Sequence, residues 1–149
     1  DSKEGDRIYS KKLIDMLYSD YYLDNTQYGL IDLVLVIIDG TGRDMGTTYK
    51  LLNEVIVPNF QKDRILVAIN QADMAMKGRH WDEEKNRPDE KLLSFLKDKT
   101  ESVVSRVKEG TGVSIKRPVF YSAERGYNIE SLLDLIVDNM PRERRNLVA

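Results

Sequence analysis

The 149-residue sequence contains no cysteine and a single histidine, His80. Disulfides and thiolate metal sites are therefore excluded, and a single histidine argues against a zinc site. The longest apolar run, Leu33–Ile38, is far too short to span a bilayer. The chain opens with charged residues and shows no basic start followed by an apolar segment, so we expect no signal peptide and a cytoplasmic protein.

The chain also lacks an excess of charge of either sign. Its 23 Lys and Arg residues against 25 Asp and Glu residues leave a formal charge of −2. This balance argues against a strongly basic nucleic-acid binder. Hydrophobic residues make up 41% and charged residues 32%, which is typical of a globular chain, and the length has room for one ordinary domain.

Three short, β-branched segments predict strands at about 31–38, 64–69 and 117–121. The first two are almost continuously apolar, which indicates burial on both faces, as in a parallel sheet. Pro118 weakens the third strand, and it would be tolerated at the strand's beginning.

Apolar residues at helical spacing predict four helices around these strands. The first covers about 7–22, and the second starts near Met45 and stops at Pro58, which cannot donate an amide. The third runs from Pro88 to Gly110, and the last is capped by Asn128 and ended by Pro141. We interpret 74–87 as an irregular insertion and 142–149 as a frayed, solvated tail.

This alternation predicts an α/β fold whose three parallel strands carry flanking helices. Ligands of such sheets bind at the carboxyl ends of the strands. The residues in these places are Asp39-Gly40-Thr41-Gly42, Asn70-Gln71-Ala72-Asp73 and Ser122-Ala123-Glu124.

Asn70-Gln71-Ala72-Asp73 resembles the guanine-reading Asn-Lys-x-Asp motif of the Era-like GTPases. The resemblance implies that Asp73 accepts hydrogen bonds from the ring N–H and exocyclic amine of guanine, a charge-assisted pair. It implies further that Asn70 ties the loop to neighbouring segments and that Gln71, which replaces the usual Lys, lays its stem along the base.

The segment Tyr121–Leu132 resembles the Ser-Ala segment of the same GTPases, in which the N–H at Ala123 donates to the guanine carbonyl. Together with Ser122 and Glu124, this completes the guanine-binding set that the resemblance implies. With the tryptophan-containing insertion between them, the two motifs are similar to those of the YfjP/YeeP/YkfA group of bacterial GTP-binding proteins. The resemblance implies that residues 1–141 are the C-terminal portion of a partial P-loop GTPase-type domain.

The phosphate-binding motif Gly-x-x-x-x-Gly-Lys-Ser/Thr does not occur in this sequence. Gly40–Thr48 also lies between a strand and a helix, but Thr47 stands where the Lys should be. The resemblance places the chain start at Asp1, just after the Asp-x-x-Gly motif on the magnesium side. We therefore expect GTP or GDP and Mg²⁺ to be ligands of the parent GTPase, and this chain alone to bind guanine nucleotide weakly and not to hydrolyse GTP.

Two other classes of function stay open. In one, the chain is a non-enzymatic α/β interaction domain whose motif residues only build turns. In the other, it is a receiver-like phosphoacceptor domain that uses Asp39, with Asn70 and Ser122 at the later strand ends. Asp39 is by itself better explained as a turn residue, Ser122 as a loop-capping hydroxyl and His80-Trp81 as a surface or packing pair.

The resemblance also implies that the strand 31–38 lacks its usual neighbour. Proteins avoid exposing a long apolar strand edge. We predict that a second copy of the chain, or the helix 7–22, covers this edge, so a homodimer through 31–38 is one expected assembly.

Overall fold

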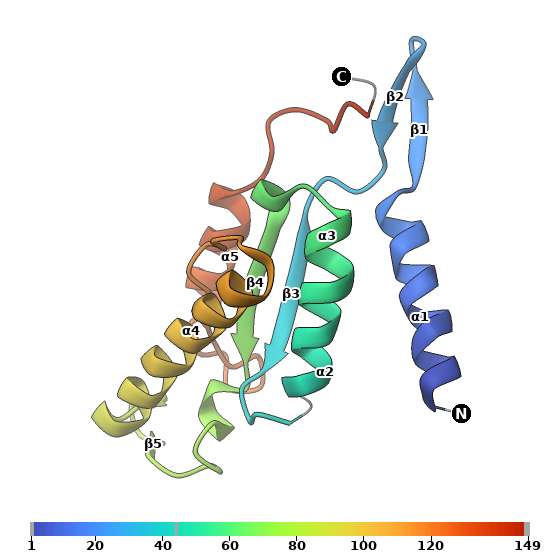
Figure 1. Ribbon diagram of the computed structural model, residues 1–149. Helices are drawn as coiled ribbons and strands as arrows, with labels where there is room; N and C mark the ends of the chain where they lie inside the picture. Colours follow the sequence, from blue (N-terminus) through green and yellow to red (C-terminus); the bar gives the residue numbers. More distant parts are fainter. Residues whose placement is uncertain (1, 44, 148–149) are drawn as a thin grey trace.

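The computed structural model describes residues 2–43 and 45–147, which form a mixed α/β structure (Figure 1). Asp1 and Asp44 lie outside the described residues, as do residues 148–149. The elements in chain order are α1 Ser2–Leu17, β1 Asp20–Leu23, β2 Thr26–Gly29, β3 Val34–Asp39, α2 Met45–Lys50, the π-helical segment η1 Leu51–Ile56, α3 Val57–Asn59, the 3-10 turn η2 Lys62–Arg64, β4 Ile65–Asn70, the 3-10 turn η3 Ala72–Met74, β5 Trp81–Asp82, β6 Arg87–Pro88, α4 Glu90–Thr111, β7 Val119–Phe120 and α5 Ile129–Asp138.

Strands β3, β4 and β7 form a parallel sheet in that order. β3 and β4 pair along their whole length, from Val34 opposite Ile65 to Asp39 opposite Asn70. Residues 65–69 of β4 are all buried, as a strand covered on both faces requires. The predicted α/β fold with three parallel strands and flanking helices is confirmed. The third strand begins at Val119, after Pro118, which has no N–H to give to the ladder, and it is only two residues long.

The main core lies on the face of the sheet that η1 and α4 cover (Figure 1). It combines alternate residues of β3 and β4 with apolar residues of those helices: Val36, Ile38, Ile65, Val67, Ile69, Leu52, Ile56, Val103 and Val107. Burying one such side chain contributes about 1.5–3 kcal/mol, so this layer holds β3 and β4 in register. The carboxyl ends of these two strands are thereby fixed side by side.

The helix that begins at Met45 continues through η1 into α3, whose last residue, Asn59, directly follows Pro58. Phe60 is already extended, so the helix stops at Pro58 to within one residue, as predicted.

Both ends of α4 differ from the prediction. The helix begins after Asp89, whose carboxylate accepts a hydrogen bond from the N–H of Leu92 at 2.9 Å. It ends at Gly112, which has a φ of 77°. Gly110 lies inside the last turn and packs against the side chain of Asn53, so it does not break the helix. A left-handed φ is what glycine supplies at a helix end, and only Gly112 needs it.

Asn128, predicted as the N-cap of α5, makes no side-chain hydrogen bond to that helix. Its backbone is left-handed, with a φ of 59°, and its Nδ2 donates to the carbonyl oxygen of Phe120 at 2.9 Å. Asn128 thus occupies the N-cap position of α5, as predicted, but its side chain fastens the loop after β7 instead of capping the helix.

The N-terminal helix ends at Leu17, and Tyr21 and Tyr22 belong to a strand instead of the predicted helix 7–22. β1 and β2 form an antiparallel hairpin around Asp24 and Asn25. Both turn residues have positive φ, 50° and 66°, as the two-residue turn that suits the twist of a hairpin requires.

The C-terminal segment is not the solvated tail that the sequence predicted. Arg145 is only 6% exposed, and its guanidinium donates to the carbonyl oxygens of Ile31 at 2.6 Å and Leu17 at 3.3 Å. It also lies 4.2 Å from the ring centroid of Phe60. The backbone N–H of Gly29 donates to the carbonyl oxygen of Arg145 at 2.8 Å, so this segment joins the hairpin to the rest of the chain.

The insertion predicted at 74–87 is partly ordered, because β5 and β6 pair as a short antiparallel ladder. Trp81 is buried against Ala72, Leu92 and Leu96. Its ring meets that of Tyr127 edge to face, with the ring centroids 5.2 Å apart. Packing, one of the two roles considered for His80-Trp81, is thus the role of Trp81.

Within residues 2–43 and 45–147, β4 is the only strand that pairs with β3, so the other edge of β3 has no strand neighbour. Helix α1 packs against η1. Ile37, on the sheet face away from the main core, is 52% exposed. No helix in the described part of the chain is long and apolar enough to cross a membrane.

Candidate functional site

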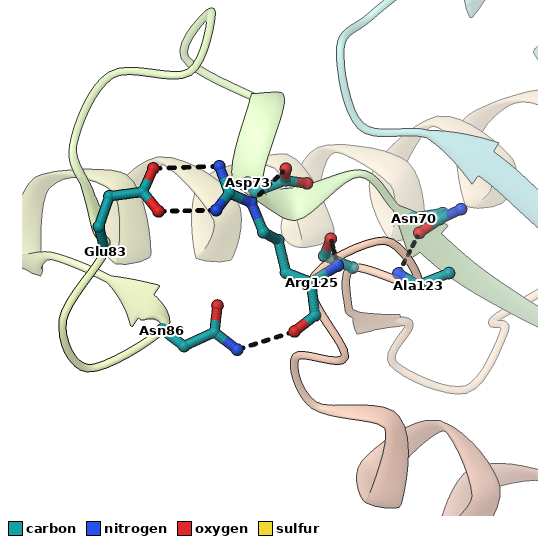
Figure 2. Close-up of polar contacts among 7 residues, drawn as sticks. Asn70, Asp73, Glu83, Asn86, Ala123 and Arg125 are labelled. Carbon is teal, nitrogen blue, oxygen red and sulfur yellow. Dashed lines mark hydrogen bonds and ion pairs between the residues drawn. The ribbon is translucent and has the colours of Figure 1, made fainter.

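The two motif loops meet at the carboxyl ends of β4 and β7. The backbone N–H of Ala123 donates to the side-chain oxygen of Asn70 at 3.0 Å, across 53 residues of sequence (Figure 2). The N–H of Ala72 also donates to the carbonyl oxygen of Tyr121 at 3.0 Å. These two bonds hold the loops together, and Asn70 joins neighbouring segments as expected from the sequence.

The first loop turns sharply at Gln71, whose φ of 60° and ψ of 39° are left-handed. A residue other than glycine rarely adopts this conformation, and such residues gather at binding sites. The turn leaves the side chain of Gln71 exposed and directs the chain into η3, where Ala72 and Asp73 are buried.

Asp73 is the buried carboxylate of the site, with a side chain only 5% exposed. Its Oδ2 lies 3.5 Å from Nε of Arg125, which comes from the second loop. At that distance the contact is an ion pair without the geometry of a short hydrogen bond. A buried carboxylate is stabilised best by short hydrogen bonds from donors, so Asp73 is suited to take further donors.

The second loop folds back on itself between Ser122 and Tyr127. Each of these residues donates its backbone N–H to the carbonyl oxygen of the other at 3.0 Å. The buried hydroxyl of Ser122 accepts the N–H of Arg125 at 3.1 Å, which is the loop-capping role weighed for it above. Glu124 is exposed on the same loop.

Three residues that the sequence analysis did not select complete this region: Arg125, Glu83 and Asn86. The guanidinium of Arg125 forms two parallel contacts with the carboxylate of Glu83, at 2.6 and 3.0 Å (Figure 2). Nδ2 of Asn86 donates to the carbonyl oxygen of Arg125 at 2.8 Å. Glu83 and Asn86 belong to the β5–β6 insertion, and no motif spacing links them to Arg125.

Asp39, at the end of β3, acts as a turn residue. Its Oδ1 accepts hydrogen bonds from the backbone N–H of Thr41 at 2.8 Å and from the Thr41 hydroxyl at 2.7 Å. Burial lowers the pKa of the nearby Lys99, and the charge of Asp39 opposes that shift. These contacts agree with the turn interpretation of Asp39.

His80 contacts Asp89, with Nδ1 and Oδ2 2.9 Å apart, beside the start of α4. Among residues 2–43 and 45–147, no group of three or more His, Asp or Glu side chains is arranged to hold a metal ion.

Comparisons of the chain with family models, with curated proteins and with solved structures returned no match.

Proposed function

We propose that this chain carries the guanine-recognition part of a GTP-binding protein. The observation that supports this most directly is the hydrogen bond from the Ala123 N–H to Asn70, which joins the two motif loops beside a buried carboxylate. The resemblance to Era-like GTPases supplies the reaction of the whole protein, GTP hydrolysis. We assign base recognition and no hydrolysis to these 149 residues, because the sequence contains no phosphate-binding Gly-x-x-x-x-Gly-Lys-Ser/Thr.

The proposed contacts follow from the chemistry of the base edge. Guanine offers two N–H donors side by side, and the carboxylate of Asp73 would accept both. Its carbonyl would accept the N–H of Ala123, and the exposed stem of Gln71 would lie along the ring. Adenine lacks this donor pair, so bound adenine would leave the buried carboxylate of Asp73 without hydrogen-bond donors, which costs free energy and disfavours adenine.

Binding requires two local changes. The N–H of Ala123 is already donated to Asn70, so the guanine carbonyl must share or replace that bond. Asp73 is covered by the side chain of Arg125, which must move away from the carboxylate. Both changes involve side chains at the surface of the loops and leave the sheet intact.

The test is a titration of the isotope-labelled 149-residue chain with guanosine monophosphate, followed by backbone amide NMR. We expect saturable shifts at Gln71, Asp73 and Ala123 and no saturable shifts there with adenosine monophosphate. Weak binding is expected, because the phosphate-binding motif is absent from the sequence. Equal responses to the two nucleotides, or no response at these amides, would refute the proposal.

The matched variant is Asp73→Asn. An amide at this position can donate to the additional carbonyl of xanthine but cannot accept two N–H groups as a carboxylate does. We expect the variant to lose its preference for guanosine over xanthosine monophosphate. A variant that keeps the preference for guanine would show that Asp73 does not read the base.

A second candidate function is that of a non-enzymatic interaction domain that assembles through β3. The edge of β3 away from β4 has no strand partner in the described residues, and Ile37 beside it is exposed. The occupant we propose is a second copy of the chain, giving a homodimer with a continuous sheet. Sedimentation velocity should show a dimer that Ile37→Lys weakens and that Leu30→Lys, a control at another exposed apolar residue, leaves intact. A monomer at millimolar concentration would exclude it.

A further inference from the structure

The side chain of Arg125 lies between two carboxylates that belong to different parts of the chain (Figure 2). On one side is Asp73, the buried carboxylate after β4. On the other is Glu83, in the β5–β6 insertion, whose side chain is 69% exposed. Arg125 itself comes from the loop after β7, so its guanidinium connects all three segments.

The two contacts of Arg125 are unequal. Toward Glu83 the guanidinium makes a two-pronged pair at 2.6 and 3.0 Å, the geometry that fixes an arginine most firmly. Toward Asp73 it presents Nε alone at 3.5 Å. Glu83 therefore sets the position of the guanidinium, and the contact with Asp73 follows from that position.

The proposed base contact and the arginine contact use the same acceptor. A guanine whose two N–H groups reach Asp73 needs both carboxylate oxygens, and Oδ2 is the oxygen that faces Nε of Arg125 in this structure. Because the Asp73 side chain is only 5% exposed, it has no room for a guanidinium and a base edge together. Occupation by the base and by the guanidinium are thus alternatives.

We propose that the guanidinium of Arg125 reversibly occupies the position beside the Asp73 carboxylate where the base would bind, and that Glu83 of the insertion holds it there. This inference rests on the proposed function and adds a way in which guanine binding is regulated. Binding of guanine displaces the guanidinium from Asp73 and changes its contact with Glu83, so the insertion responds to the nucleotide. Because such coupling is reciprocal, a partner that binds the insertion and draws Glu83 away would change the affinity for guanine by the same factor.

The backbone contacts of the loop make this proposal testable by substitution of the side chain alone. The N–H of Arg125 bonds to Ser122, and its carbonyl oxygen accepts from Asn86. Neither contact uses the guanidinium, so Arg125→Met keeps the loop and removes the cation. Arg117→Met is the matched control, because Arg117 forms an exposed pair with Glu101 on another part of the surface.

The experiment measures the affinity of the 149-residue chain and its variants for guanosine monophosphate by amide NMR. We expect Arg125→Met to bind about two- to fivefold more tightly than the wild-type chain, and Glu83→Gln about twofold, the range that pairs of this exposure contribute. Arg117→Met should bind as the wild type does. In the wild-type chain the amides of Glu83 and Asn86 should shift on titration, and in Arg125→Met they should not.

Equal or weaker binding by Arg125→Met would overturn the proposal, and so would shifts at Glu83 that persist in that variant. If Arg125→Met does not fold, Glu83→Gln decides by the same criteria. Failure of the proposed function is a different result, in which neither the wild-type chain nor any variant prefers guanosine over adenosine monophosphate.

Discussion

Gly40 lies where the loop after β3 passes the loop after β4, with its N–H directed at Asn70. Its N–H donates to the carbonyl oxygen of Asn70 at 2.8 Å. A Cβ at this position would overlap that carbonyl oxygen and lie 3.0 Å from the carbonyl oxygen of Gln71. These are backbone atoms, so no side-chain rotation can relieve the overlap in Gly40→Ala.

The expected cost of Gly40→Ala has two parts. Forcing one extra carbon into a packed region costs about 1–3 kcal/mol, and weakening the bond to Asn70 costs about 0.5–1.5 kcal/mol more. We expect a loss of about 1.5–4.5 kcal/mol in the free energy of unfolding, measured by urea denaturation. For a chain of this size that corresponds to a fall in melting temperature of about 3–18 °C.

The chain supplies a matched control in Gly46, where a Cβ would meet nothing within 4 Å. Gly46 lies in α2, so Gly46→Ala should raise stability by about 0.5–1 kcal/mol through helix propensity. The same substitution should thus have opposite signs at two positions six residues apart. A Gly40→Ala protein within about 0.5 kcal/mol of the wild type would refute the reasoning that this approach is tight.

Three further predictions concern the hydrogen bond between the loops and two shifted pKa values. Asn70→Ala removes the acceptor of the Ala123 N–H, so it should cost about 0.5–1.5 kcal/mol in urea denaturation and raise hydrogen exchange at Ala123; unchanged exchange would contradict the bond. The N–H of Leu92 holds the pKa of Asp89 below its ordinary 3.8, so the ionised cap stabilises the fold above that pH and its contribution is lost as the pH falls below it. Asp89→Asn should therefore destabilise at about pH 6 and approach the wild type by about pH 2, and a constant difference in melting temperature would argue against an ionised cap. Burial lowers the pKa of Lys99, so its charged ammonium destabilises the folded state at neutral pH, and this cost disappears as the pH rises toward 10.5. Lys99→Met should therefore raise the melting temperature at about pH 7 and raise it less at about pH 10. A lower melting temperature of the variant at neutral pH would show that the ammonium stabilises the fold.

The sheet could be predicted from the sequence because its first two strands are almost continuously apolar, but the burial on both faces that this pattern predicts holds only for β4, since Ile37 of β3 is 52% exposed. The positions of turns and helix ends were harder to predict from the sequence. The helix predicted over about 7–22 extends too far, because Asp24-Asn25 forms the turn of a hairpin, and residues that accept a positive φ can end either a helix or a hairpin strand. Gly110 and Gly112 are equally good helix breakers by composition, and only the packing of Gly110 against Asn53 distinguishes them.

The proximity of Asn70 and Ala123 could be predicted because both follow neighbouring parallel strands. Arg125 and Glu83 could not be paired in this way. Their contact depends on how the insertion folds, which depends on the packing of Trp81 against η3 and α4. A sequence pattern reports what each segment prefers alone, and the position of Glu83 is set by a contact between segments.

The contacts of Arg145 affect the order in which the chain folds. Its guanidinium donates to the carbonyl oxygen of Leu17, which lies 128 residues earlier in the sequence. At ribosomal rates of about 5–20 residues per second, Leu17 waits on the order of ten seconds for this donor. The parallel strands and their helices can pair during that time, since all of them emerge before Arg145. The hairpin of β1 and β2 is thus the first strand pair to be synthesised and among the last to be secured.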